Sequence, residues 1–253
     1  MQYFTAYSKR NPVLLFLEAC LAGLAKMRGG AMKTVALFLF IFASYGYSQE
    51  AIKYDAVKNN ITKKQQYFSK IYASSGTEKQ KEVVREAQAY LTTTISDSLF
   101  SYWYGTPWNF NGTTKVPKQG TIACGYFVTA ILSDAGFQIP RVKWAQSASE
   151  PVIVKIATNV QRFRNQPMNK LIDYLNKQGD GLYIVGLDNH VGFISKRGNN
   201  LRFIHSSYYH PETGVMPEPL EGHNPLNDSR YRIIGKLLDT EMTLNWINGV
   251  EYK

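Results

Sequence analysis

Cys124 is the residue of this 253-residue chain that is best suited to nucleophilic chemistry. It follows a long loop rich in glycine and aromatic residues, and a helical pattern begins beside it at Gly125. Unpaired backbone N–H groups and the helix dipole at such a position favour a thiolate, which is the nucleophilic form of cysteine. The same N–H groups can hold an oxyanion that develops on an attacked carbonyl group. We therefore expect a reactive cysteine here, and the alternative is a buried, inert one.

A cysteine nucleophile needs a base, and all four histidines of the chain follow the cysteine. His190 begins one predicted strand and His205 ends the next, with a two-residue turn at Gly198–Asn199 between the strands. In that register the numbers of paired residues sum to 397, so the two histidines are diagonal neighbours on one sheet face. Such a pair supplies a base and a group that orients it. His210 and His223 are expected to be structural or solvated.

Helical patterns dominate before the cysteine, and strand patterns dominate towards the end of the chain. Residues 77–100 carry apolar side chains at helical spacing, which predicts an amphipathic helix. Residues 150–176 also have a mostly helical pattern. Helices followed by a sheet indicate the α+β class. The predicted strands lie within residues 182–187, 191–194, 201–204 and 231–238.

The beginning of the chain has the pattern of an export signal. A short cationic start at Met32–Lys33 precedes an apolar run of about ten residues, and small residues follow it. We expect a signal peptide over residues 32–48 with cleavage near Ser48–Gln49, and an over-extended N-terminus over residues 1–31. The apolar run is shorter than the roughly 20 residues that span a bilayer. The sequence thus predicts an exported protein, periplasmic or extracellular, without a stable membrane span.

Cleavage at that position would change the charge and the cysteine content. Loss of residues 1–48 removes five basic residues and one acidic residue, so the formal net charge falls from +10 to +6. A modest positive charge suits an anionic partner such as a cell-wall polymer, and the lack of an arginine-rich block argues against nucleic acid. Cys20 is also lost, which leaves Cys124 without a disulfide partner and favours a reactive role.

No cofactor is implied by the sequence. The alternative is a zinc ion bound by Cys124, His190 and His205, but the spacing of these residues lacks a short pair of ligands. We therefore expect no metal ion at these three residues.

Six short segments between Gly105 and Ser207 form an ordered series. They are Gly105–Gly112 (GTPWNFNG), Ala123–Val128 (ACGYFV), Ile139–Gln146 (IPRVKWAQ), Gly179–Tyr183 (GDGLY), His190–Ile194 (HVGFI) and Phe203–Ser206 (FIHS). In this order they resemble the motifs of the NlpC family of papain-like cell-wall cysteine peptidases. The resemblance implies an α+β, papain-like core with the nucleophile cysteine at a helix N-terminus, packed on an antiparallel β-sheet with an N-terminal helical layer.

The resemblance also implies a role for each site residue. Cys124 would be the nucleophile, His190 the base and His205 the residue that orients the base. Ala123 and Gly125 stand where the family has Asp and Ser, and that Asp helps to hold the free amine of a peptide stem, so the usual substrate contact is missing. The implied substrate-binding residues are Trp108, Phe110, Ala123, Gly125, Tyr126 and Gln146; Trp108 replaces a tyrosine and Tyr126 a glycine.

These observations predict an exported cysteine endopeptidase or amidase that acts on peptidoglycan stem peptides or a related amide. Residues 49–100 would form a helical N-terminal segment and residues 101–253 the hydrolase domain. One alternative is a catalytically silent module that binds glycan or peptide through Trp103, Tyr104, Trp108 and Phe110. Another alternative is an acyl or lipid-amide hydrolase or transferase on the same scaffold.

Overall fold

The computed structural model describes the backbone from Gly30 and the side chains from Ala51 to Lys253. The expected over-extended N-terminus and the side chains of the expected signal peptide therefore lie outside the described residues. The chain divides into two units, residues 1–52 and residues 53–253, and the second contains the sheet and the site. Within the described part of the chain, no helix combines the length and the apolar character that crossing a membrane requires.

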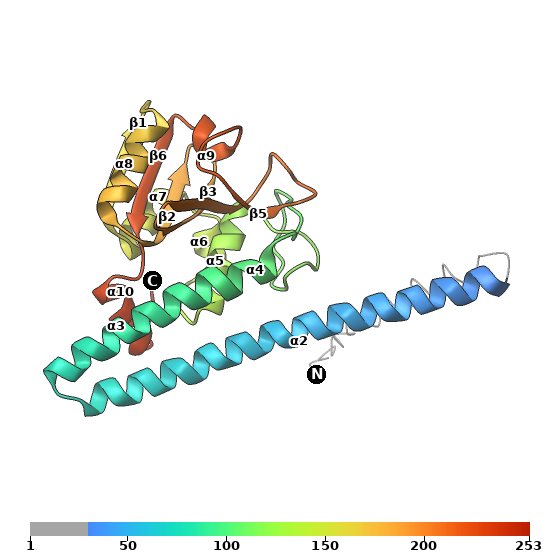
Figure 1. Ribbon diagram of the computed structural model, residues 1–253, viewed down its shortest axis with the longest axis horizontal. Helices are drawn as coiled ribbons and strands as arrows, with labels where there is room; N and C mark the ends of the chain where they lie inside the picture. Colours follow the sequence, from blue (N-terminus) through green and yellow to red (C-terminus); the bar gives the residue numbers. More distant parts are fainter. Residues whose placement is uncertain (1–29) are drawn as a thin grey trace, which may run out of the picture. The chain divides into compact units, whose positions relative to one another are not determined.

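Two long helices precede the sheet and are joined by a short connection at Ser75–Gly76 (Figure 1). They are α2 (Gly30–Ser74) and α3 (Thr77–Thr93), which continues through a π-helical segment, Thr94–Leu99, into α4 (Phe100–Trp103). The predicted apolar stripe of residues 77–100 is confirmed, because every member of it is buried. These members are Val84, Ala87, Leu91, Ile95 and Leu99.

Six antiparallel strands form one sheet in the order β1-β6-β2-β3-β4-β5. The α+β class is therefore confirmed, with helices and an antiparallel sheet in one chain. The bounds of the strands are Thr158–Arg164 for β1, Gly181–Leu187 for β2, Val191–Arg197 for β3, Asn200–Ser206 for β4, Val215–Glu218 for β5 and Tyr231–Lys236 for β6.

The predicted register of the central hairpin is confirmed. Phe193 pairs with Ile204 and Lys196 pairs with Leu201, so the numbers of paired residues sum to 397. Because side chains alternate between the two faces of a strand, this register places His190 and His205 on one face, as the sequence predicted. A slip of one residue would have separated them.

Each face of the sheet packs against a different set of helices. On one face, Ile184, Phe193 and Ile233 join the large core that includes α2, α3 and α5 (Cys124–Asp134). On the other face, Val185 and Ile194 pack against α8 (Met168–Gln178). The sheet is thus covered on both sides. The remaining helices are α6 (Arg141–Ala145), α7 (Ser149–Ile156), α9 (Pro225–Asp228) and α10 (Thr240–Ile247).

The helical prediction for residues 150–176 is wrong in its middle part. The structure has α7, then strand β1, then α8 over this stretch. Strand β1 lies at the edge of the sheet, and Phe163 is its one buried side chain. A polar edge strand lacks the alternating pattern that a half-buried strand shows in a sequence. Strand β5 was missed as well, because Pro217 interrupts its pattern.

Helix α2 attaches to the core through buried residues that recur every seven positions: Tyr54, Ile61 and Phe68. We expect Ile61→Ala to lower the free energy of unfolding by about 2–5 kcal/mol, because it removes a fully buried aliphatic side chain and leaves a cavity. Thr62→Ala, at the exposed neighbouring position, should change it by less than about 0.5 kcal/mol. Equilibrium denaturation in urea measures both, and equal effects would contradict the packing of this stripe.

Candidate active site

Cys124 is the first residue of α5, and Ala123 is its N-cap with an extended backbone. The sequence prediction of a cysteine at a helix start is therefore confirmed. Gly125 is required next to it, because a Cβ atom at that position would lie 2.2 Å from the carbonyl oxygen of Ala145. This contact explains why the chain has glycine where the family it resembles has serine.

The loop between α4 and α5 ties the cysteine to strand β4, which carries His205, and to its neighbour β5. The N–H group of Gly105 donates to the carbonyl oxygen of Val215 in β5 (2.9 Å). At the other end of the loop, the Ser206 hydroxyl in β4 donates to the carbonyl oxygen of Ile122, two residues before Cys124 (2.7 Å). These bonds fix the helix start relative to the strands.

His190, His205 and Glu218 form a hydrogen-bonded chain. His190 Nε2 lies 2.8 Å from His205 Nδ1, and His205 Nε2 lies 2.5 Å from Glu218 Oε2. His190 is 4% exposed and His205 is fully buried. The ring of Phe203 stacks on His205 with a centroid distance of 4.1 Å. The imidazole rings therefore have little freedom to turn.

The carboxylate end of this chain determines which ring nitrogens carry hydrogen. A carboxylate only accepts hydrogen bonds, so Nε2–H of His205 donates to Glu218. Nδ1 of neutral His205 then accepts from Nε2–H of His190, and the lone pair of neutral His190 is left on Nδ1. Among the described residues this Nδ1 atom is buried and has no hydrogen-bond partner. Glu218 thus leaves His190 with one unoccupied basic nitrogen.

Glu218 was not predicted from the sequence. In the structure β5 pairs with β4 so that Met216 is opposite His205 and Glu218 is opposite Phe203. Glu218 is therefore a diagonal neighbour of His205 on the same face of the sheet. The prolines on either side of Glu218 hide the strand, and no motif in the sequence singles out this carboxylate.

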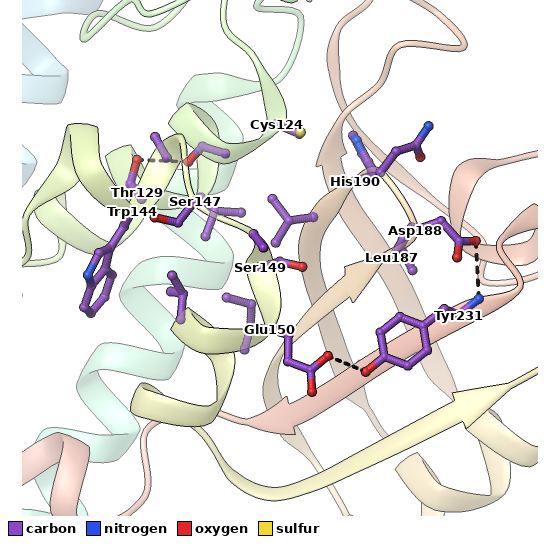
Figure 2. Close-up of a pocket in the computed structure, with 18 residues that line it drawn as sticks. Cys124, Thr129, Trp144, Ser147, Ser149, Glu150, Leu187, Asp188, His190 and Tyr231 are labelled. Carbon is purple, nitrogen blue, oxygen red and sulfur yellow. Dashed lines mark hydrogen bonds between the residues drawn. The ribbon is translucent and has the colours of Figure 1, made fainter.

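The thiol and the imidazole face each other across the upper part of a pocket, as Figure 2 shows for Cys124 and His190. The pocket has a volume of about 400 Å³ and lies between α5, α7 and the sheet. Val128, Ile184 and Leu187 contribute apolar walls, and Glu150 and Asp188 lie among its polar lining. A nucleophile, a base and space for a ligand group therefore occur together.

Burial controls the protonation of both reacting groups. It raises the pKa of the Cys124 thiol, while the backbone N–H groups of Val191 and Gly125 act in the opposite direction. Burial, together with the neighbouring His205, holds the pKa of His190 well below its usual range. The expected stabilisation of a thiolate at the helix start is thus present but smaller than the cost of burial. The pair rests as neutral thiol and neutral imidazole near pH 7.

The six residues proposed to bind substrate are not all brought together. Gly125 lines the pocket, whereas the backbone N–H of Ala123 donates to Gly112. The amide of Gln146 donates to the Tyr126 hydroxyl outside the pocket lining (3.1 Å).

The aromatic residues of the loop have separate locations. The Trp108 ring lies 6.1 Å from the ring of Tyr208, which in turn contacts His190 at 5.2 Å between ring centroids. Phe110 is 79% exposed and lies outside the pocket lining. Trp103 is fully buried. The alternative that assigned Trp103 to a ligand-binding surface is therefore wrong for that residue.

The zinc alternative does not fit the hydrogen bonds of His205. Both of its ring nitrogens are occupied, one by His190 and the other by Glu218, so a bound metal ion would have to break one of these contacts. Among the described residues, no group of three or more histidine, cysteine or acidic side chains has an arrangement that could hold a metal ion.

The raised thiol pKa and the lowered imidazole pKa predict a single step in the reactivity of Cys124 with pH. Because a raised pKa keeps the thiol protonated to higher pH, alkylation by iodoacetamide should rise with pH and be half-maximal above about 8.5, the value of a free cysteine. Peptide mass spectrometry of Cys124 after timed labelling measures the rate, with N-acetylcysteine as the control. A plateau of reactivity between pH 5 and 7 would instead show a stable thiolate–imidazolium pair.

The role of Glu218 in selecting the tautomers predicts a specific effect of Glu218→Gln. An amide at this position can donate to His205 Nε2, which would shift both imidazoles to the Nδ1–H form and remove the base. ¹⁵N NMR of the four histidines should report this shift, and turnover of an amide substrate should fall about 10²- to 10⁴-fold. His210→Ala, at an exposed residue 4.0 Å from Glu218, should leave both tautomers unchanged. Unchanged tautomers in Glu218→Gln would contradict this role.

Comparisons with models of protein families, with curated proteins and with solved structures found no match for this chain. The resemblance of the six segments to a peptidase family therefore stays an interpretation of the sequence. The case for a function depends on the geometry of Cys124, His190, His205 and Glu218.

Proposed function

We propose that this protein is an exported cysteine hydrolase of the papain-like, NlpC type that cleaves amide bonds in peptidoglycan stem peptides. The observation that carries the proposal is the free, buried Nδ1 atom of His190, a residue that lines the same pocket as Cys124. A buried polar atom without a partner is costly to a fold. A proton from the thiol or from a leaving group would give this atom the partner that it lacks.

The proposed reaction begins with transfer of the Cys124 thiol proton to His190 Nδ1 as Sγ attacks the carbonyl carbon. Backbone N–H groups at the start of α5 stabilise the resulting oxyanion. The intermediate collapses when His190 protonates the leaving amine, and a thioester remains on Cys124. Water then attacks the thioester with His190 as base, which releases the acid and restores the thiol. Glu218 and His205 hold the imidazole and stabilise its positive charge in both steps.

The peptidoglycan substrate and the exported location depend on the sequence. The six segments resemble a family that acts on the bacterial cell wall, and residues 32–48 have the pattern of a signal peptide. Ala123 supplies no carboxylate to hold a stem-peptide amine, so the bond that is cleaved differs from the usual one of that family, or its amine is held by other residues.

Among the alternatives, the silent binding module is disfavoured by the site itself. A module without catalysis has no use for a buried hydrogen-bonded chain that ends in a free basic nitrogen. The aromatic surface proposed for the module also loses Trp103, which donates to the Tyr54 hydroxyl in the core (2.8 Å). The acyl or lipid-amide hydrolase would use the same four residues, so the substrate alone distinguishes it from the peptidase.

Digestion of purified peptidoglycan fragments tests the proposal. Mass spectrometry of the products should show hydrolysed amide bonds with the wild-type protein, and Cys124→Ala or His190→Ala should lower the rate by at least about 10³-fold. His223→Ala is a matched control, because His223 is exposed, pairs with Asp228 and lies outside the pocket lining. The proposal is falsified if Cys124→Ala cleaves as fast as the wild type.

A further inference from the structure

The pocket beside Cys124 has an apolar interior. Its deeper walls come from Val128 in α5, Val152 in α7, and Ile184 and Leu187 in the sheet, and all four side chains are buried. Thr129 also lies there, but its hydroxyl is satisfied by the carbonyl oxygen of Gly125 (2.9 Å). These side chains therefore offer no free hydrogen-bonding group to a polar ligand. The Ser149 hydroxyl lines the pocket as well (Figure 2), so a preference for an apolar group depends on the four aliphatic side chains.

Carboxylates, and no lysine or arginine, are found in the lining of this pocket. Asp188 accepts hydrogen bonds from the Ser229 hydroxyl (2.7 Å) and the Arg230 N–H group (2.8 Å), and these contacts lower the pKa of its carboxyl group. Glu150 accepts from the Tyr231 hydroxyl (2.6 Å) and from Arg162, which likewise lowers its pKa. Arg162 offsets the charge of Glu150, and Arg230 acts in the same direction on Asp188, whose carboxylate is exposed. Because no cation belongs to the lining itself, the pocket has no group that would pair with an anionic ligand.

A second feature indicates that a ligand enters this pocket. The unpartnered Nδ1 atom belongs to His190, which lines the pocket and is almost fully buried. The Cys124 sulfur faces the same space (Figure 2). A group that fills the pocket is therefore within a few bonds of the atom that reacts with sulfur. Because the acyl group stays on sulfur while the amine departs, the acyl side of the substrate is the part that can remain there.

We propose that this pocket binds the acyl side of the substrate through an uncharged aliphatic group and discriminates against a carboxylate. The proposal rests on the proposed function, because it assumes that Cys124 forms an acyl-enzyme. A volume of about 400 Å³ is enough for an aliphatic amino-acid side chain or a short fatty acyl chain. Both have the same chemistry, a hydrocarbon next to the reacting carbonyl group.

Chloromethyl ketones provide a test that does not depend on the leaving group. The Cys124 sulfur displaces chloride to form a thioether, and the thiol proton is taken up by His190. Ketones built on N-acetyl-leucine, on N-acetyl-glutamate and on hexanoic acid should label Cys124 at different rates, measured by mass spectrometry. We expect the leucine or the hexanoyl compound to react at least about tenfold faster than the glutamate compound. Each methylene or methyl group buried in the pocket strengthens binding of the first two compounds, and the carboxylate of the third gains no such contact. If the leucine compound reacts faster than the hexanoyl compound, the aliphatic group is an amino-acid side chain. The reverse order identifies a fatty acyl chain.

A pair of serine variants tests whether the pocket causes this preference. Ser147 lines the pocket, is exposed, and donates to the carbonyl oxygen four residues earlier. Ser74 is exposed, makes the same kind of bond at the end of α2, and lies outside the pocket lining. Ser147→Lys should reduce the leucine-to-glutamate ratio by at least about threefold, because it places a cation where none is present. Ser74→Lys should leave the ratio unchanged.

The outcomes separate the two proposals. Equal labelling by the leucine and glutamate compounds, or faster labelling by glutamate, would overturn the aliphatic pocket and leave Cys124 as a nucleophile. The same conclusion follows if Ser147→Lys and Ser74→Lys change the ratio equally. If no ketone labels Cys124 faster than it labels N-acetylcysteine, the cysteine is not activated and the proposed function fails as well.

Discussion

The hydrogen-bonded chain from Glu218 through His205 to His190 is the interaction on which the site depends. Glu218 belongs to β5, His205 belongs to β4, and His190 directly precedes β3. The chain therefore forms only if strands β3, β4 and β5 pair in one register. In a dry interior an imidazole without a fixed partner can adopt either tautomer, and only one of them leaves the correct nitrogen basic. A single carboxylate at the far end removes this ambiguity. The antiparallel sheet is therefore part of the chemistry as well as the support for it.

Burial has opposite effects on binding and on reactivity in this site. Burial strengthens hydrogen bonds to a developing charge, but it also raises the pKa of the Cys124 thiol and lowers that of His190. A resting pair of neutral groups is the result, and in the proposed reaction charge separation occurs only when a carbonyl group accepts electrons from sulfur. The N–H groups of Val191 and Gly125, which oppose the effect of burial on the thiol, lie next to the atom that becomes charged. A thiol that stays protonated because of burial should also react slowly with alkylating reagents at neutral pH.

Features of the fold and the site that depend on residues close together in the sequence could be predicted, and features that join distant segments could not. The helix start at Cys124 and the register of the β3–β4 hairpin are local features, and both were predicted because glycine turns and alternating side chains determine them. Glu218 was not predicted, since its place beside His205 depends on a short strand that prolines disguise. The edge strand β1 was mistaken for a helix because only one of its side chains is buried, which leaves no alternating pattern. Trp103 was assigned to a surface because the sequence does not distinguish an aromatic residue of a loop from one of the core. Pairings that join distant segments were thus the ones missed.

One departure from the motifs that the sequence resembles, Gly125 in place of serine, is explained by packing at one point of the fold. Serine in place of Gly125 would collide with the Ala145 carbonyl oxygen, so the close approach of α6 to the start of α5 determines this residue. The same approach places Ala145 and Trp144 in the lining of the pocket and brings the segment around Ser147 to its edge. A contact that excludes a side chain next to the nucleophile therefore also shapes the space in front of it. If α6 lay farther from α5, serine would fit after the cysteine, but this wall of the pocket would be lost. The glycine after Cys124 and the shape of the pocket therefore have one structural cause.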